Sequence, residues 1–553
     1  MRIRYTITIC LLIFLILPGT CFAASSITLT GSGLDLEQIV AVARGNASVI
    51  LEESAMKRVE ASHKLPLQAA REGKNVYGLN TGVGINKDRV VFSGDVLARE
   101  AREASENFNN HLLVTHAVSI GPRAPRDVVR ATMLIRCNQA LTGHAAFHPD
   151  IVRMYAAFLN KGVHPLLPMQ GTVGMADITV LPYIGLVMSG QHQAEVNGTV
   201  MPGADALAAA GLAAVKPYAK DGLALVSSNA FSAGLAALAC VDAARLLRLA
   251  DTVAALSLEG LNGNIAPFLA ESQRLRPFKG PMGSAANIRN DLEGSYLYSD
   301  HPRRPMQDPL SFRDSAMTHG TALDALENLR KNLLIHVNHQ DDNPAVVTDA
   351  GFDEANAFLT KRYSINPGKK NDGPAGLVLA NANFDPLIWV TDLERLGIAF
   401  SHISRASAQR VLKLAADRFT GLSRNLAPDS ANIGYLTIQK TASLLDAEIR
   451  TLSMPVSVDV LPLSGEIEDM GTNAALVVER LNGQMDRLHA MFAVETLHGT
   501  RAFGLRKRDE PALVLGKGTR ALYDAVTALV PAVGDDRIQG PDIEKVAALL
   551  AGK

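Results

Sequence analysis

Apolar residues recur at helical spacing through most of the chain from about residue 205 onward. This spacing gathers apolar side chains on one face of a helix and is typical of long packed α-helices. The stretches, all rich in alanine and leucine, are 204–215, 220–262, 313–338, 385–425, 433–452 and 468–498. The pattern predicts a mainly α protein.

The N-terminal part shows a more broken pattern. Helical spacing covers 34–74 and recurs around 95–120 and 125–160. The stretch 176–202 instead alternates Thr, Val and Ile with polar residues, and it contains Asn197-Gly198, a dipeptide typical of tight hairpin turns. We therefore predict helices with one short strand pair in this part.

Three stretches rich in glycine, proline, asparagine or charge predict loops. They are 78–88, 275–310 and 363–376, of which we expect the last two to lie over the mouth of a site. We divide the chain into an N-terminal region, 24–220, that carries the loops with candidate chemistry, and a central helical bundle with C-terminal helices, 221–553.

The composition narrows the class of protein. The chain has 553 residues, 47% hydrophobic and 20% charged, with a formal net charge of −1, which suits a folded helical protein. This balance gives no reason to expect nucleic acid or a membrane surface as a partner.

No cysteine spacing predicts a zinc site, and we expect no metal. Cys137 and Cys240 fall in apolar helical patterns and are expected to be buried, while the sequence leaves a disulfide between them open.

The first residues resemble a secretory signal. A short basic segment, Met1–Arg4, precedes an apolar run from Tyr5 to Pro18, and Cys21-Phe22-Ala23 offers a cleavage site before Ala24. The apolar run is shorter than the roughly 20 residues of a membrane span. We predict a signal peptide over 1–23 and a secreted, periplasmic mature protein; a lipid anchor through Cys21 is the less favoured alternative.

Several short motifs carry side chains suited to acid–base or anion-binding chemistry. In chain order they are Tyr77-Gly78-Leu79-Asn80-Thr81-Gly82-Val83-Gly84, Leu113-Val114-Thr115-His116, Gln307-Asp308-Pro309-Leu310-Ser311-Phe312-Arg313, Asp342-Asn343-Pro344, Asn383-Phe384, and Ser457-Val458-Asp459 followed by Glu468-Asp469. Their order resembles that of the histidine and phenylalanine ammonia-lyase family. The resemblance implies an all-helical lyase fold, with a long central bundle and a smaller N-terminal region carrying the active-site loops. It also implies a homotetramer whose active sites are shared between subunits.

The resemblance assigns a role to each motif. Tyr77 would be the base that removes a weakly acidic β-proton. Arg313 would pair with the substrate carboxylate through its planar fork, with Gln307 and Asn383 beside it. His116 would bind an imidazole-type ring.

Glu468 would face the same ring and marks the histidine-type branch of the family. Simpler interpretations stay open: Tyr77 as a packing lid, Arg313 in an internal ion pair with Asp308 or Asp314, and Glu468 as a solvated helix start.

The segment Gly171–Thr179 departs from the family at its most characteristic position. In the family the matching loop contains Ala-Ser-Gly, which cyclises and loses water to give an electrophilic methylidene-imidazolone. Met175-Ala176-Asp177 stands there instead, without the serine or the glycine. We therefore expect this cofactor to be absent. Ser227 replaces a family asparagine that supports the electrophile, and Leu310 replaces a family tyrosine.

Two charged residues are gains rather than losses. Lys440 lies four residues after Leu436, a position that resembles a ring-contacting one, so the two share a helix face. An ammonium there would need a partner, and Glu468 is the expected one. Asp177 lies where the electrophile would be and could attract a cationic amine; capping a helix through the following turn is its alternative role.

These retained and lost residues indicate a substrate class. The electrophile of the family acts on the lone pair of a primary amine, whereas a trimethylammonium group has no lone pair and already leaves as a neutral amine. We expect a carbon–nitrogen lyase that eliminates trimethylamine from ergothioneine, the betaine of 2-thiohistidine, to give thiourocanate. Alternatives are a lyase acting on another quaternary histidine betaine, a histidine ammonia-lyase-like enzyme, and a secreted betaine-binding protein without turnover.

Overall fold

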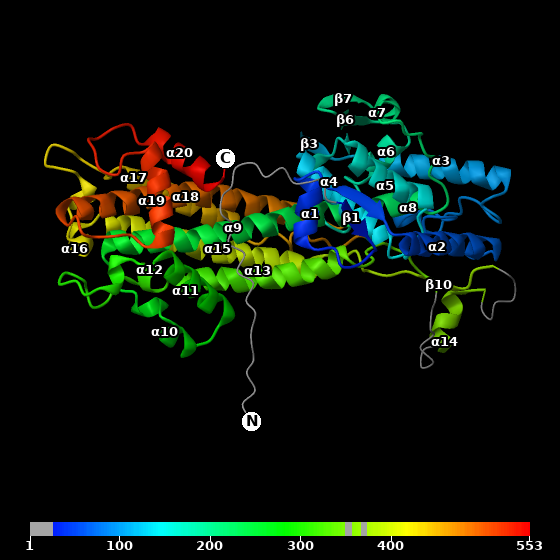
Figure 1. Cartoon of the computed structure of the whole chain (residues 1–553). Helices are drawn as coiled ribbons and strands as arrows, with labels where there is room; N and C mark the ends of the chain where they lie inside the picture. The colour runs from blue at the N-terminus through cyan, green and yellow to red at the C-terminus, as the bar shows by residue number, and fades with distance from the viewer. Residues whose placement is uncertain (1–25, 349–356, 367–372, 553) are drawn as a thin grey trace.

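The computed structural model describes residues 26–348, 357–366 and 373–552. The predicted signal peptide and its cleavage site lie outside the described residues, as does the middle of the predicted loop 363–376. Figure 1 shows an elongated molecule with a bundle of long helices on one side and a region of shorter helices and small sheets on the other.

The long helices confirm the prediction of a mainly α protein with a central bundle. Its main members are α9 (Ala230–Leu261), α13 (Ser315–Val337), α15 (Leu387–Leu414), α17 (Ile438–Leu452) and α18 (Ala474–Asp509). Shorter helices cover them: α10 (Ala270–Arg274), α11 (Lys279–Asp291), α12 (Leu310–Arg313), α16 (Asp417–Thr420), α19 (Lys517–Leu529) and α20 (Gly540–Leu550). One apolar core extends from the N-terminal strands to α18.

The predicted helix 220–262 is interrupted. The structure has α8 (Asp221–Val226), a break at 227–229, and then α9. In the break, Ser228 Oγ and the Asn229 backbone N–H both donate to the buried Asp341 carboxylate, at 2.9 Å each. These bonds turn the backbone aside and set the start of α9. By length and composition alone this helical segment could cross a membrane, but 94% of its most apolar window is buried inside the protein.

The N-terminal region combines helices with short strands. Its helices are α1 (Leu36–Ala43), α2 (Glu53–Arg71), α3 (Arg99–His116), α4 (Arg126–Ala140), α5 (Pro149–Lys161), α6 (Pro182–Met188) and α7 (Gly203–Ala209). Its strands are β1 (Ser26–Leu29), parallel to β2 (Ser48–Leu51), then β3 (Ile120–Arg123) with β5 (Pro168–Gln170), and β4 (Val163–Pro165) with the hairpin β6 (Gln193–Val196) and β7 (Thr199–Pro202). The hairpin confirms the strand pair predicted around Asn197-Gly198.

A further small sheet projects from this region. Its strand order is β8 (Ala345–Val347), β10 (Gly376–Leu379) and β9 (Ser364–Ile365), all antiparallel, and the short helix α14 (Ala357–Thr360) lies beside it. Cys137 and Cys240 are buried, as predicted, and both are free thiols.

Two predictions of local structure are wrong. The stretch 34–74 is not one helix, because β2 separates α1 from α2 and pairs with β1. The stretch 275–310 is not all loop, because it contains α11, whose Ser284 hydroxyl donates to Asp251 on α9. Tertiary pairing with distant segments decides both cases, and local spacing does not report it.

Candidate active site

Tyr77 lies in the loop after α2, with its hydroxyl held by the same loop. The backbone N–H of Gly84 donates a hydrogen bond of 2.7 Å to Tyr77 Oη. Burial raises the pKa of Tyr77 above its ordinary value, the Gly84 N–H counteracts this rise, and the nearby Glu468 carboxylate adds to it. A donor aimed at the phenolic oxygen favours the phenolate that a base needs.

Gly84 also allows the loop to meet a segment from far along the chain. Its φ of +55° is in the left-handed region, and a Cβ there would lie 2.6 Å from Ser464 Oγ and 3.9 Å from Glu468 Oε1. The segment Leu463–Glu468 closes on itself through two backbone hydrogen bonds, of 2.8 and 3.2 Å. A side chain at position 84 would therefore push this segment away from Tyr77.

His116 is the last residue of α3 and lies on the Glu468 side of this cluster. Its Nδ1 is 2.8 Å from the Leu112 carbonyl oxygen. Because a carbonyl only accepts, Nδ1 carries the proton and Nε2 is left as the acceptor of the neutral ring. Burial raises the pKa of Glu468, while the neighbouring His116 opposes the rise. Tyr77, His116 and Glu468 thus lie near one another in one cluster.

The altered loop lies beside this cluster. Its Val173 carbonyl accepts hydrogen bonds from the backbone N–H groups of Thr472 and Asn473, at 2.9 and 2.8 Å. Gly171 contacts Ser119, three residues after His116, where a Cβ would lie 2.6 Å from the serine hydroxyl. The loop is therefore fixed between the segments that follow His116 and Glu468.

Asp177 is fully buried in this loop and acts as a helix cap. Its carboxylate accepts hydrogen bonds from the backbone N–H and the hydroxyl of Ser232, at 2.7 and 2.6 Å, and from the Thr172 hydroxyl at 2.8 Å. Ser232 lies in the first turn of α9. Burial raises the pKa of Asp177 to about 6. The geometry favours the capping role over the alternative of an open site for a cationic amine.

The loop does not fit the cyclised cofactor of the family. Ring closure needs the amide nitrogen of residue 177 as the attacking group and a serine at 176 that can dehydrate. Here the Asp177 N–H donates to the Ser228 carbonyl at 2.8 Å, and residue 176 is alanine. The side-chain amide of Asn229, directly before α9, donates to the Gly174 carbonyl at 2.9 Å and so anchors the loop.

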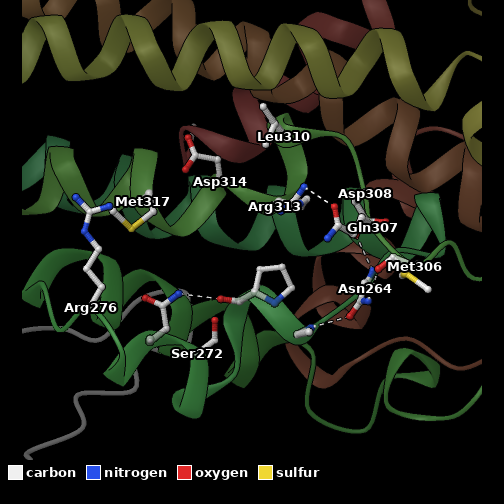
Figure 2. Close-up of a pocket in the computed structure, with 13 residues that line it drawn as sticks. Asn264, Ser272, Arg276, Met306, Gln307, Asp308, Leu310, Arg313, Asp314 and Met317 are labelled. Carbon is white, nitrogen blue, oxygen red and sulfur yellow. Dashed lines mark hydrogen bonds between the residues drawn. The ribbon is translucent and has the colours of Figure 1, made fainter.

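Arg313 and Gln307 line a separate cavity of about 460 Å³ on the bundle. Arg313 donates to Gln307 Oε1 at 3.0 Å, and not to Asp308, which instead accepts the backbone N–H of Asn264. Figure 2 shows Arg313 and Gln307 on one wall of the cavity, with Ser272 and Arg276 across from them. The exposed Leu310 stands at the edge of this cavity.

The remaining candidates lie apart from both groups. Lys440 is exposed near the start of α17, which lies with α12 at the end of the bundle away from α2 and α3 (Figure 1). Within the described chain it does not form the expected pair with Glu468. Asn383 is exposed before α15 and donates to Gln340 at 2.8 Å.

In the described part of the chain, no group of three or more His, Cys, Asp or Glu residues could hold a metal ion.

Sequence reasoning missed several residues that shape the site. Gly84 was recognised only as part of a motif, although its position seven residues after Tyr77 is what brings its N–H to the hydroxyl. Ser464, Thr172 and Ser232 carry no motif signal, because each acts on a partner that only the fold brings near.

Comparisons with known proteins identify the family of the chain. The chain matches the family model of aromatic amino acid lyases over residues 34–528. It is 33% identical to a histidine ammonia-lyase of Gloeobacter violaceus over 532 residues, covering 95% of this chain and 96% of that protein.

Solved structures are similar over nearly the whole chain. An ergothionase from Treponema denticola, in complex with desmethyl-ergothioneine sulfonic acid, is 34% identical with a TM-score of 0.86, covering 96% of this chain and 99% of that one. A phenylalanine aminomutase from Pantoea agglomerans is 26% identical with a TM-score of 0.83, covering 95% and 99%. The chain therefore belongs to the aromatic amino acid lyase family, as a carbon–nitrogen lyase of the histidine type.

Proposed function

We propose that this lyase eliminates trimethylamine from ergothioneine to give thiourocanate, without a methylidene-imidazolone. The observation that carries the proposal is the combination of an intact Tyr77–His116–Glu468 cluster with a neighbouring loop that cannot form the electrophile. The similarity to an ergothionase supports the same substrate.

Tyr77 is the base of the reaction. Its phenolate, stabilised by the Gly84 N–H, takes the β-proton of the substrate. The electron pair of the broken C–H bond forms the Cα–Cβ double bond, and the C–N bond breaks with its electron pair going to nitrogen. Trimethylamine leaves as a neutral molecule, so no group has to accept a lone pair from the amine.

The imidazole side of the substrate lies against His116 and Glu468. The acceptor Nε2 of His116 can take a hydrogen bond from a ring N–H, because Leu112 fixes its tautomer. Glu468 is half-buried next to it. Both groups favour an imidazole-type ring over phenyl, since phenyl would leave them without partners.

The carboxylate anchor comes from another copy of the chain. Arg313 and Gln307 line a cavity that contains none of the Tyr77 cluster, so one chain alone carries only part of the site. A homotetramer with shared active sites would bring Arg313 to the substrate carboxylate, Asn383 near it, and Lys440 to Glu468 beside the ring sulfur. In this scheme Asp177 holds the loop in place and does not pair with the amine, so no carboxylate contacts the trimethylammonium group.

The enzyme is assigned to the periplasm on the basis of the predicted signal peptide over 1–23. Expression of the full chain followed by fractionation and N-terminal sequencing tests this assignment. A periplasmic product that starts at Ala24 is the expected result; a cytoplasmic product that keeps Met1 would overturn it.

The substrate assignment is tested by a panel of three compounds. Purified mature protein is mixed separately with ergothioneine, histidine betaine and histidine; the absorbance of the conjugated acrylate is followed, and the released amine is assayed. Trimethylamine from ergothioneine and no ammonia from histidine is the expected result. A preference for histidine betaine would move the proposal to another quaternary betaine, and ammonia from histidine would contradict it.

A binding protein without turnover is the second candidate. It predicts that ergothioneine binds but is never consumed. The Gly84 N–H that donates to the Tyr77 hydroxyl argues against it, because a site that only binds has no need of a donor directed at a base.

A further inference from the structure

The altered loop is cross-linked by hydrogen bonds at the place where its relatives carry a covalent ring. Thr172 Oγ1 donates to Asp177 Oδ1 at 2.8 Å and accepts the backbone N–H of Gly174 at 3.0 Å. Thr172 therefore joins the first half of the loop to its end. The backbone between them is held as a closed turn.

Asp177 ties this turn to the start of a long helix, α9. Ser232 donates both its backbone N–H and its hydroxyl to the Asp177 carboxylate. Ser232 is in the first turn of α9, a helix of 32 residues, whose N-terminus favours a negative charge. Asp177 and Ser232 are both 0% exposed, so these charge-assisted bonds do not compete with water.

The loop also contacts segments that lead away from the cluster described above. Its backbone is bonded to Thr472 and Asn473, and Gly171 contacts Ser119. Val173 and Met175 are half-buried on the loop, while Asp177 points inward. The loop thus presents an uncharged surface and keeps its only carboxylate behind that surface.

We propose that Asp177 is a positioning residue which, through Thr172 and Ser232, holds the loop in place of the covalent ring. The fixed loop supplies a neutral wall, formed by Val173 and Met175, against the trimethylammonium group of the substrate. This inference rests on the proposed function for its substrate, but the clasp itself, defined as Thr172, Asp177 and Ser232, can be tested without turnover.

Direct pairing of Asp177 with the ammonium makes a different prediction from the clasp. If the carboxylate attracts the cation, its loss weakens only cationic ligands. If the carboxylate shapes the loop, its loss weakens a neutral ligand of the same shape equally. The carbon isostere of ergothioneine, with a tert-butyl group in place of trimethylammonium, separates the two cases.

The experiment uses Thr172→Val and Asp177→Asn in the full mature enzyme, singly and together. For each variant, KM for ergothioneine and the inhibition constant of the tert-butyl isostere are measured. Both constants should rise by about tenfold in each single variant, because each removes a hydrogen bond to a buried charge. The double variant should be little worse than the worse single one, because both act on the same bond.

Ser284→Ala is the matched control. It removes a hydroxyl donor from another buried carboxylate, Asp251 of α9, away from the loop. It should lower the melting temperature without changing either constant.

Amide hydrogen exchange of residues 171–177 provides the readout that does not need activity. Exchange should quicken in Thr172→Val and Asp177→Asn and stay unchanged in Ser284→Ala. Thr172→Val keeps the cap on α9 and remains informative if Asp177→Asn fails to fold.

The proposal is overturned if Asp177→Asn weakens ergothioneine but not the isostere, or if loop exchange is unchanged in Thr172→Val. If the wild-type enzyme does not convert ergothioneine but loop exchange responds as described, the proposed function fails and the clasp stands.

Discussion

The Tyr77 cluster and the Arg313 cavity are built in different ways. The cluster draws on three distant segments, and the Tyr77, His116 and Glu468 side chains are at least partly buried against fixed partners. The cavity is open, and its Arg313 donates to Gln307, six residues earlier. The three side chains of the cluster are thus brought together within one chain, whereas Arg313 and Gln307 lie in a cavity that contains none of them.

Tyr77→Phe should have the largest effect. Without its base the enzyme should lose about 10³-fold or more in kcat, in line with what general bases contribute. Ergothioneine should still bind, because the ring and carboxylate contacts remain. Steady-state rates and calorimetric titration measure the two quantities. Activity near the wild-type level would exclude Tyr77 as the base.

Arg313→Met should have the next largest effect. Losing a bidentate partner of the carboxylate should reduce kcat/KM by about 10- to 100-fold, mostly through KM. Mixing this variant with Tyr77→Phe during refolding or co-expression should restore part of the activity, because some mixed sites would contain both intact residues. Activity that stays at the level of the two separate variants would contradict shared active sites.

Lys440→Met should reduce kcat/KM for ergothioneine by about tenfold, the scale of one charge-assisted contact. The loss should be smaller for histidine betaine, which lacks the sulfur that the ammonium would complement. Equal losses with both compounds would remove Lys440 from the ring site.

Glu468→Gln should shift the pH profile. The Glu468 carboxylate raises the pKa of Tyr77, so neutralising it lowers that pKa. Because the phenolate is the active form, kcat/KM should reach half its maximum at a lower pH than in the wild type. A pH–rate profile of both enzymes measures the shift, and an unmoved rising limb, on which the rate increases with pH, would show that Glu468 does not act on Tyr77.

Sequence spacing predicted the long helices because their apolar faces repeat locally. It could not predict β2, which forms only by pairing with β1, nor α11, whose burial depends on α9 and α13.

The candidate site divides in the same way. The resemblance singled out Tyr77, His116 and Glu468, which lie near one another in the fold, but the orientation of Asp177 depends on Ser232, 55 residues away. Within the described residues Arg313 and Lys440 lie apart from the Tyr77 cluster, so the fold of one chain does not bring these predicted residues together.

The central claim is elimination without the family electrophile. The most direct measurement is the mass of the proteolytic peptide containing Met175–Asp177, taken from an enzyme sample that is releasing trimethylamine from ergothioneine. The account predicts an unmodified linear peptide in the active enzyme. A peptide that has lost water at this position, or activity only in the fraction that has lost it, would contradict the account.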